Sequence, residues 1–348
     1  MKKIKTGIAG FGISAKVFHA PFLHLHPGYE ITHFLERNKS ESDRLYPYAQ
    51  IVRSYDELLD ADTDLIVITT PNDTHYEYAT KALKAGKHVV VEKPFTLTSE
   101  EAKELVWLSK TSKGVLSVYH NRRYVSDFLT IKKILEENRL GKVHEYIGRF
   151  DRYRAEARPG AWREQPVPGS GILYDLGPHL IDQAIQLFGM PQSVYADIRR
   201  QRPHAVTDDY FELWLDYGHL KVTLHAGMLI REMGPRYLIH GDKGSFVKPG
   251  DDPQEALLRQ GVMPDTPNWG AEPESSWGIL HTENPNGIIR EKIPSEKGNF
   301  GQYYNNLYET IINGAGLKEK PEDGYRTIKI IELAIQSHQK GQKMMVNE

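Results

Sequence analysis

Short strand-like segments separated by amphipathic segments dominate the first third of the chain. They cover residues 5–9, 30–35, 65–68, 88–91 and 115–118. The segments at 65–68 and 88–91 are continuous apolar runs, which are typical of strands that are buried on both faces of a parallel sheet. Because the segments between them have the spacing of helices, the pattern predicts a doubly wound α/β domain of the Rossmann type.

Helix starts are marked by three capping boxes, in which a threonine or serine is followed three residues later by glutamate. They begin at Ser54, Thr74 and Thr98, and Gly86 is placed to end the second helix. Pro21 lies inside the first predicted helix, where its ring should kink or end that helix.

The pattern changes after residue 121. Helices are predicted over residues 128–137 and 172–188, and a last helix carries Ile328, Ile331 and Ile335. Residues 211–217 and 222–226 alternate between apolar and mixed positions, as in an antiparallel sheet, while residues 251–297 predict an irregular extension. We therefore expect a Rossmann domain over residues 1–121 and an α+β domain with a large, mostly antiparallel open sheet over residues 122–348.

A glycine-rich turn follows the first strand at once. It has the form Gly10-x-Gly12-x-x-Ala15 and leads into a helix. Gly10 permits a tight turn, Gly12 allows a pyrophosphate to approach the backbone, and Ala15 lets helix and strand pack closely. This context favours a dinucleotide site at the helix N-terminus. The alternative is a plain turn between a strand and a helix in another doubly wound domain.

Candidate ligand-binding residues follow the predicted strands, at the point where each strand ends. They are Gly10, Glu36, Thr70, Lys93 and Asn121. Ligands of open α/β sheets bind at this edge. Glu36 would favour NAD by binding the ribose hydroxyls, whereas the neighbouring Arg37 would favour the extra phosphate of NADP. The two residues point to opposite preferences, so the sequence leaves both cofactors open.

Composition narrows the possible partners. The 348 residues are 39% hydrophobic and 26% charged, with a net charge of −2 and no cysteine. Two domains fit this length, and nothing in the charge attracts nucleic acid or an anionic membrane. The lack of cysteine excludes disulfides, thiolate nucleophiles and cysteine-ligated zinc. No apolar run is long enough for a membrane span and no signal peptide is evident, so we expect a cytoplasmic protein.

Two motifs carry candidate chemistry. Lys93 stands between a buried strand and Pro94 at the expected cofactor edge; the alternative is a surface lysine that begins a loop. Asp175 and His179 lie four residues apart, hence on one face of a helix, where a carboxylate can orient a proton-transferring imidazole. A helix ion pair is the first alternative. A metal pair is the weaker alternative, because no third ligand has matching spacing.

These motifs together resemble the Gfo/Idh/MocA family of oxidoreductases. Gly10-x-Gly12-x-x-Ala15, Glu92-Lys93-Pro94 and Asp175-x-x-x-His179 carry the resemblance, which spans the whole chain. Longer strings such as FHAPFL, TTPNDTHYEYA and LYDLGPHLIDQAIQLFG are most similar to the branch that contains NADP-dependent scyllo-inositol dehydrogenase. Glu36 departs from the small or basic residue associated with the NADP-using branch.

The resemblance implies catalytic roles for Lys93, Asp175 and His179. The implied cofactor contacts are Gly10, Phe11, Gly12, Ile13, Glu36, Arg37, Thr69, Thr70, Pro71, Asn72, His75, Glu92, Lys93 and Asn121, with Trp162 and Arg163 reaching the nicotinamide end. Substrate hydroxyls would meet Lys93, Asp175, His179 and the polar residues His120, Arg122, Tyr124 and Tyr153.

The resulting hypothesis is an NAD(P)-dependent oxidoreductase that transfers a hydride to or from a cyclic polyol or sugar. In the oxidation direction His179 would remove the hydroxyl proton and Lys93 would stabilise the reacting oxygen. One alternative is a cofactor- or sugar-sensing regulator on the same fold, and another is a metal-dependent lyase or hydrolase. We also expect a homodimer or homotetramer, because the sheet face that carries Tyr210 and Trp214 is too aromatic to stay wholly exposed.

Overall fold

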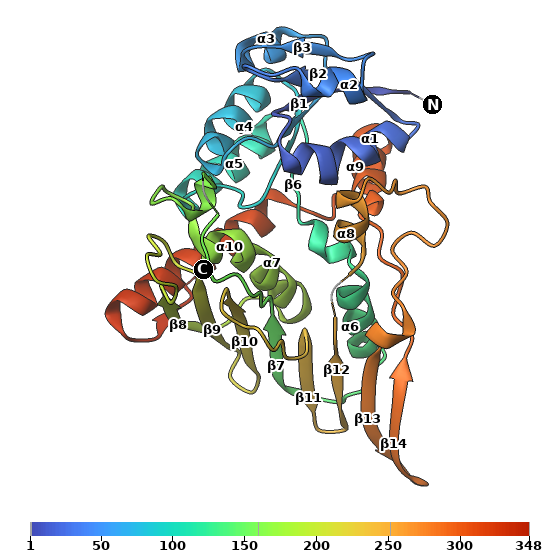
Figure 1. The fold of residues 1–348 in the computed structure, drawn as a ribbon, viewed down its shortest axis with the longest axis vertical. Helices are drawn as coiled ribbons and strands as arrows, with labels where there is room; N and C mark the ends of the chain where they lie inside the picture. The colour runs from blue at the N-terminus through green and yellow to red at the C-terminus, as the bar shows by residue number, and fades with distance from the viewer. Residues whose placement is uncertain (1, 159, 251, 348) are drawn as a thin grey trace. The chain divides into compact units, whose positions relative to one another are not determined.

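The computed structural model describes residues 2–158, 160–250 and 252–347 and divides into two compact units (Figure 1). The first unit contains residues 1–124, 254–269 and 299–325, and the second contains the remainder. Within the described residues no helix is long and apolar enough to cross a membrane.

The first unit is built on a six-stranded parallel sheet. Its strands in spatial order are β3 (Gln50–Val52), β2 (Tyr29–Leu35), β1 (Ile4–Ala9), β4 (Leu65–Ile68), β5 (His88–Val91) and β6 (Leu116–Val118). Every residue of β4 is fully buried, as are the three valines of β5. The predicted Rossmann fold is confirmed; only β3, a three-residue edge strand, was not predicted.

Most helices of this unit connect its strands, while η3 follows the last strand and α8 and α9 belong to later segments of the chain. The helices are η1 (Ala15–His19), α1 (Ala20–Leu25), α2 (Glu41–Leu45), α3 (Tyr55–Asp60), η2 (Asn72–Thr74), α4 (His75–Lys84), α5 (Ser99–Thr111), η3 (Asn121–Tyr124), α8 (Gln254–Arg259) and α9 (Gly301–Asn313). The capping hydroxyls of Ser54 and Thr98 accept from the amides of Glu57 and Glu101, as predicted. The prediction for Thr74 was wrong, because its hydroxyl donates to the Pro71 carbonyl instead.

Pro21 ends the first helical segment, as expected. A five-residue π-helix, η1, stops at His19, and α1 begins with the proline in its first turn, where its missing N–H costs no hydrogen bond. The π-helix places the His19 side chain in the buried interior, and single π turns of this kind are frequent at functional sites.

The second unit is built on a nine-stranded sheet. Its strands in spatial order are β14 (Gly287–Ile293), β13 (Gly278–Asn284), β12 (Gly244–Lys248), β11 (Tyr237–Gly241), β7 (Val143–Arg149), β10 (Lys221–Gly227), β9 (Tyr210–Asp216), β8 (Ser193–Arg199) and β15 (Met344–Met345). Only the β7–β10 pair is parallel among the pairings described. The expected mostly antiparallel sheet is confirmed.

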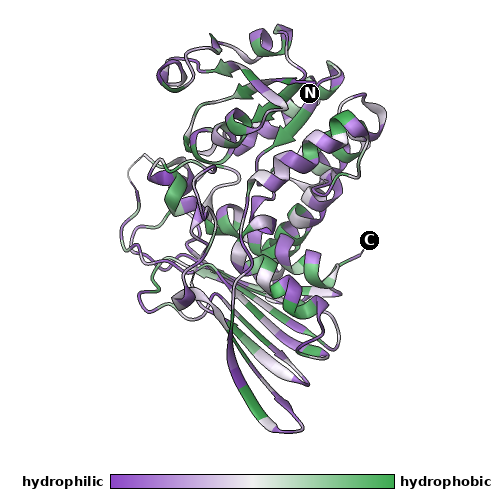
Figure 2. Ribbon diagram, turned by 90° about the vertical axis from the view of Figure 1, so that its right-hand side faces the viewer, coloured by the Kyte–Doolittle hydropathy of each residue, from purple (hydrophilic) through white to green (hydrophobic). Residues whose placement is uncertain are grey.

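The two faces of this sheet differ as the alternation predicts. Phe211, Leu213 and Leu215 of β9 are fully buried, and helix α7 (Gly171–Phe188) packs against β9 and β10. Trp214, which points the other way, is 40% exposed. Apolar and polar residues alternate along these strands in Figure 2. The other helices of the chain are α6 (Ser126–Glu136), η4 (Trp162–Glu164), η5 (Glu274–Ser276) and α10 (Pro321–Lys340).

Two expectations about the C-terminal part were wrong. The predicted irregular extension over residues 251–297 contains the β13–β14 hairpin, whose outer strand is mostly exposed and therefore lacks an apolar period. The predicted continuous domain over residues 122–348 instead returns two segments to the first unit. Tyr303 and Tyr304 of α9 explain this return, because both are buried and pack against Tyr119 of the Rossmann unit.

Candidate active site

The glycine turn has the geometry that a dinucleotide requires. Gly10 has a φ of +96°, which side-chain-bearing residues rarely adopt, and a β-carbon at Gly12 would meet no atom within 4 Å. Thr69 braces this turn from β4, since its hydroxyl lies 3.0 Å from the Ala9 oxygen and 3.1 Å from the Gly10 oxygen. The open space over Gly12 fits the approach of a pyrophosphate. Phe11 is buried against Phe34, whereas Ile13 is exposed.

Glu36 does not point to open solvent at the end of β2. Its carboxylate accepts the backbone N–H groups of Glu41 and Ser42, at 3.0 and 2.8 Å, and also the Ser42 hydroxyl. The side chain is buried and caps the start of α2. Arg53 holds the same loop through the carbonyl oxygens of Glu36 and Lys39. Arg37 is exposed beside this fixed loop.

His75 connects the loops that follow β4 and β5 through hydrogen bonds. Its two ring nitrogens lie 3.0 Å from the Thr70 carbonyl oxygen and 2.8 Å from that of Pro94. Complete burial lowers the pKa of the imidazole, although the two carbonyls oppose this effect. Asn72 is buried in the same segment, and Pro71 is exposed beside it. This arrangement fixes the backbone that directly follows Lys93.

Glu92 is the centre of a buried hydrogen-bond network. One carboxylate oxygen meets the His19 ring nitrogen at 2.9 Å and the Ser14 hydroxyl, while the other accepts the Lys93 backbone N–H at 2.9 Å. Burial raises the pKa of this carboxyl, but His19, Lys93 and Ser14 outweigh that effect and lower it to about 2. The ionised Glu92 therefore ties Lys93 to the segment that directly follows the glycine turn.

His19 and Tyr304 were missed as members of this network. The Tyr304 hydroxyl lies 2.6 Å from the second ring nitrogen of His19, across 285 residues of sequence. His19 falls inside the family-like string FHAPFL, so a signal for it existed. Tyr304 had none, because its partner is set by the docking of α9 and not by any local pattern.

The residues after β6 have partners within the first unit. Arg122 forms an ion pair with Glu255, and the buried Tyr124 hydroxyl donates to Glu319 at 2.8 Å. His120 and Asn121 are buried in the same segment. These contacts give Arg122 and Tyr124 a structural role in holding η3, whatever substrate contacts they make.

In the second unit, helix α7 carries both Asp175 and His179. Gly171 starts the helix with a φ of +87°, and Asp208 accepts the Leu173 N–H at 2.8 Å. Asp175 faces Arg163, whose Nε lies 3.1 Å from the carboxylate. The guanidinium of Arg163 also lies 4.6 Å from the centre of the Trp162 ring. The predicted Trp162–Arg163 pair is therefore next to Asp175.

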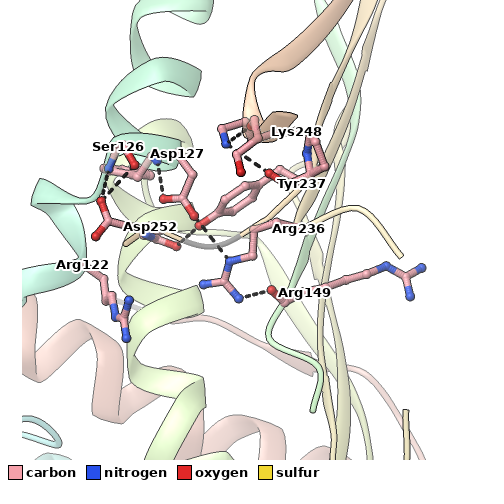
Figure 3. A network of polar contacts seen from close by, with 12 residues as sticks. Arg122, Ser126, Asp127, Arg149, Arg236, Tyr237, Lys248 and Asp252 are labelled. Atoms are coloured by element: carbon pink, nitrogen blue, oxygen red, sulfur yellow. Dashed lines mark hydrogen bonds and ion pairs between the residues drawn. The ribbon is translucent and has the colours of Figure 1, made fainter. Parts of the chain in front are cut away.

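His179 is buried one turn further along α7. Its ring centre lies 6.3 Å from that of Phe150, and the Arg236 guanidinium covers Phe150 at 3.7 Å. Arg236 is held by Asp127 and by the Arg149 carbonyl oxygen, as Figure 3 shows. Buried charge thus supports the wall beside His179. Tyr153 is 43% exposed, with the Arg231 guanidinium over its ring.

Comparisons with known proteins found two protein-family models that together match most of the chain. A model described as "Oxidoreductase family, NAD-binding Rossmann fold" matches residues 4–120, and one described as "Oxidoreductase family, C-terminal alpha/beta domain" matches residues 132–346. The chain belongs to the Gfo/Idh/MocA oxidoreductase family. The scyllo-inositol 2-dehydrogenase (NADP(+)) IolW of Bacillus subtilis is 42% identical over 99% of this chain and 96% of its own length.

A solved structure and a second curated enzyme are also similar to this chain. The oxidoreductase YvaA of Bacillus subtilis has a solved structure that superposes with a TM-score of 0.96, at 41% identity and 99% coverage of both chains. The D-glucoside 3-dehydrogenase of Escherichia coli is 26% identical over 54% of this chain and 55% of its own length. This Gfo/Idh/MocA chain is thus an NAD(P)-binding oxidoreductase. No metal-holding cluster occurs among the residues that the structure describes.

Proposed function

We propose that this protein transfers a hydride between NADP and a secondary alcohol or ketone of a cyclic polyol or sugar. The observation that carries the proposal is the carboxylate of Glu92, which holds the Lys93 backbone and the Ser14 hydroxyl at once. A lysine fixed next to the glycine turn is suited to act on the oxygen whose carbon gives or takes the hydride. Relatives named for scyllo-inositol and D-glucoside support a polyol or sugar as substrate class.

The three candidate catalytic residues have different roles in this proposal. His179 accepts the hydroxyl proton in the oxidation direction, because imidazole exchanges protons near neutral pH. The Lys93 ammonium donates a hydrogen bond to the same oxygen and stabilises the negative charge that develops there. Asp175 orients the substrate or His179. Bound NADP+ supplies the hydride acceptor.

The preference for NADP is supported by the end of β2. A ribose-binding carboxylate must face the ribose, but the Glu36 carboxylate is buried against the start of α2 with three donors. The exposed charge at this point is Arg37, and a guanidinium suits a 2′-phosphate. The relative IolW is named for NADP(+). The departure at Glu36 therefore does not count against NADP.

Turnover of single variants tests the proposal. Lys93→Ala and His179→Ala should each lower kcat by about 10²–10⁴-fold with scyllo-inositol or a related polyol, since each removes a group that acts on the reacting oxygen. Lys84→Ala and His219→Ala, which change exposed residues, are matched controls. NADPH affinity, measured by calorimetric titration, should change little in the catalytic variants. Unchanged turnover in both would defeat the assignment.

We also propose that a second copy of this chain covers the mixed face of the nine-stranded sheet. Tyr195 stacks on Trp214, and the Lys221 ammonium lies over the Trp214 ring. Exposed aromatic residues of this kind are enriched in protein interfaces. Light scattering of the purified protein at micromolar concentration should give a dimer or tetramer, and a monomer would contradict this part of the proposal. The absence of cysteine fits a cytoplasmic location, which belongs to the same proposal.

A further inference from the structure

A cationic cavity opens beside Asp175 within the second unit. Its volume is about 130 Å³, and its wall includes the start of α7 and the Trp162–Arg163 pair. Five arginines line it: Arg152, Arg154, Arg158, Arg163 and Arg202. The described lining residues include only three carboxylates, those of Glu164, Asp175 and Asp208. The cavity wall therefore carries more positive than negative charge.

The carboxylates present are already shared among these arginines or bound elsewhere. Glu164 lies 3.4 Å from Arg154 and 3.0 Å from Arg202. Asp208 accepts the Leu173 N–H at the start of α7. Burial lowers the pKa of Arg154, and the positive charges of Arg158 and Arg202 lower it further, against the opposing effect of Glu164. An anion in the cavity would relieve this repulsion.

The arginines differ in what holds them. Arg202 is buried and bonded to Asp209 at 2.9 Å, so it braces the wall. Arg154 is half-buried, and Arg158 is exposed at the cavity. A wall that only needed bracing would be served by Arg202 and its carboxylates. Planar guanidinium groups converging on one cavity are the donors that carboxylate and phosphate oxygens prefer.

We propose that this cavity binds a carboxylate or phosphate group that the substrate itself carries, so that the enzyme prefers an acidic or phosphorylated sugar or polyol to a neutral one. The inference rests on the proposed function, because Asp175 is both a proposed catalytic residue and part of the cavity wall. A group held here would be attached to the same molecule that Asp175 contacts. The cavity is larger than a single water requires, so it has room for such a group.

Direct binding separates this inference from the proposed function. Glucose, gluconate, glucuronate and glucose 6-phosphate, with myo-inositol and its monophosphate, are titrated calorimetrically into the full-length protein with and without NADP+. The best anionic ligand should bind about tenfold or more tightly than its neutral partner, since a hydrogen bond between charged groups is stronger than one between neutral groups. NADP+ reduction with the same ligands is measured separately.

Single-residue variants test whether the anionic group binds in this cavity. Arg154→Gln and Arg158→Gln should each abolish most of the anionic advantage and leave the affinity for neutral sugars and NADPH unchanged. Arg199→Gln, which removes an exposed arginine outside the cavity, should bind like the parent protein. Circular dichroism and thermal unfolding confirm that each variant folds. Raising the salt concentration should weaken the anionic ligands selectively.

Several results of these measurements would overturn the inference. Equal affinity for charged and neutral partners, or an advantage that survives both arginine variants, overturns the inference. A loss of NADPH affinity in the arginine variants also overturns it, because the anion would then belong to the cofactor. If inorganic phosphate added to glucose restores the full advantage, the anion need not be part of the substrate and the inference again fails. Turnover of neutral polyols alone leaves the proposed function standing, while failure of all turnover with intact anion selectivity removes only the proposed function.

Discussion

Two regions of the molecule organise buried charge in opposite ways. Beside the glycine turn of the first unit the centres are carboxylates: Glu36 collects backbone N–H groups of α2, and Glu92 collects His19, Ser14 and the Lys93 amide. Near helix α7 of the second unit the centres are guanidiniums, with Arg202 held by two carboxylates and Arg236 held by Asp127. Each centre is buried and has several partners, as buried charges require.

This difference matches what each unit is proposed to bind. The anionic centres of the first unit act inside the protein, where they fix the backbone that carries the two cations proposed to contact the ligand, Lys93 and Arg37. In the second unit the arginines outnumber the carboxylates around the cavity beside Asp175. Both arrangements offer positive charge to a ligand, but one does so by fixing the backbone and the other by collecting guanidiniums.

Among the residues that hold the first unit's site in place, the largest effect is expected at Glu92. Glu92→Gln keeps the shape but removes the charge that holds His19 and Lys93, so kcat should fall by about 10²-fold through misplacement of Lys93. The folded protein lowers the pKa of this carboxyl from 4.5 to about 2. Ionised Glu92 thus adds stability, about 3 kcal/mol, that is fully present above about pH 5 and is lost as the pH falls toward 2.

Urea unfolding of the parent protein and Glu92→Gln at several pH values measures this contribution. The difference in unfolding free energy should be greatest near neutral pH and should shrink below pH 5. Glu100→Gln, at an exposed position of α5, is the matched control and should show no such dependence. A difference that stays constant down to the lowest accessible pH, or that grows as the pH falls, would show that Glu92 is not the ionised centre of this network.

Local patterns predicted most of the first unit and its rim. The predicted strand segments located five of the six strands, and the hydroxyl caps at Ser54 and Thr98 formed because their partners lie within one helical turn. The cap at Thr74 did not form, because the preceding turn η2 runs directly into α4 and gives Thr74 a helical backbone conformation, in which its hydroxyl donates to the Pro71 carbonyl. The β13–β14 hairpin could not be predicted from periodicity, because an exposed edge strand has no buried face to impose a period of two.

The site shows the same division between local and long-range information. Lys93 stood out because it directly follows a strand, and Asp175 and His179 stood out because their spacing of four places them on one helix face. The direction of the Glu36 side chain did not, since it depends on amides of a helix that begins five residues later. Tyr304 and the cavity arginines depend on tertiary packing. Sequence can therefore propose the reacting groups of this fold more readily than the contacts that hold them.

Arg37 provides the smaller and more selective test of the first unit. Arg37→Ala should weaken NADPH binding about tenfold and leave NADH binding unchanged, because only NADPH carries the 2′-phosphate that the guanidinium is proposed to bind. Arg44→Ala, an exposed change on α2, should affect neither cofactor. Calorimetric titration of both cofactors into Glu36→Ala completes the comparison. If the Glu36 carboxylate only caps α2, this variant should lose stability without a selective loss of NADH affinity; a selective loss would mean that Glu36 leaves α2 to bind the ribose, and the NADP preference would be wrong.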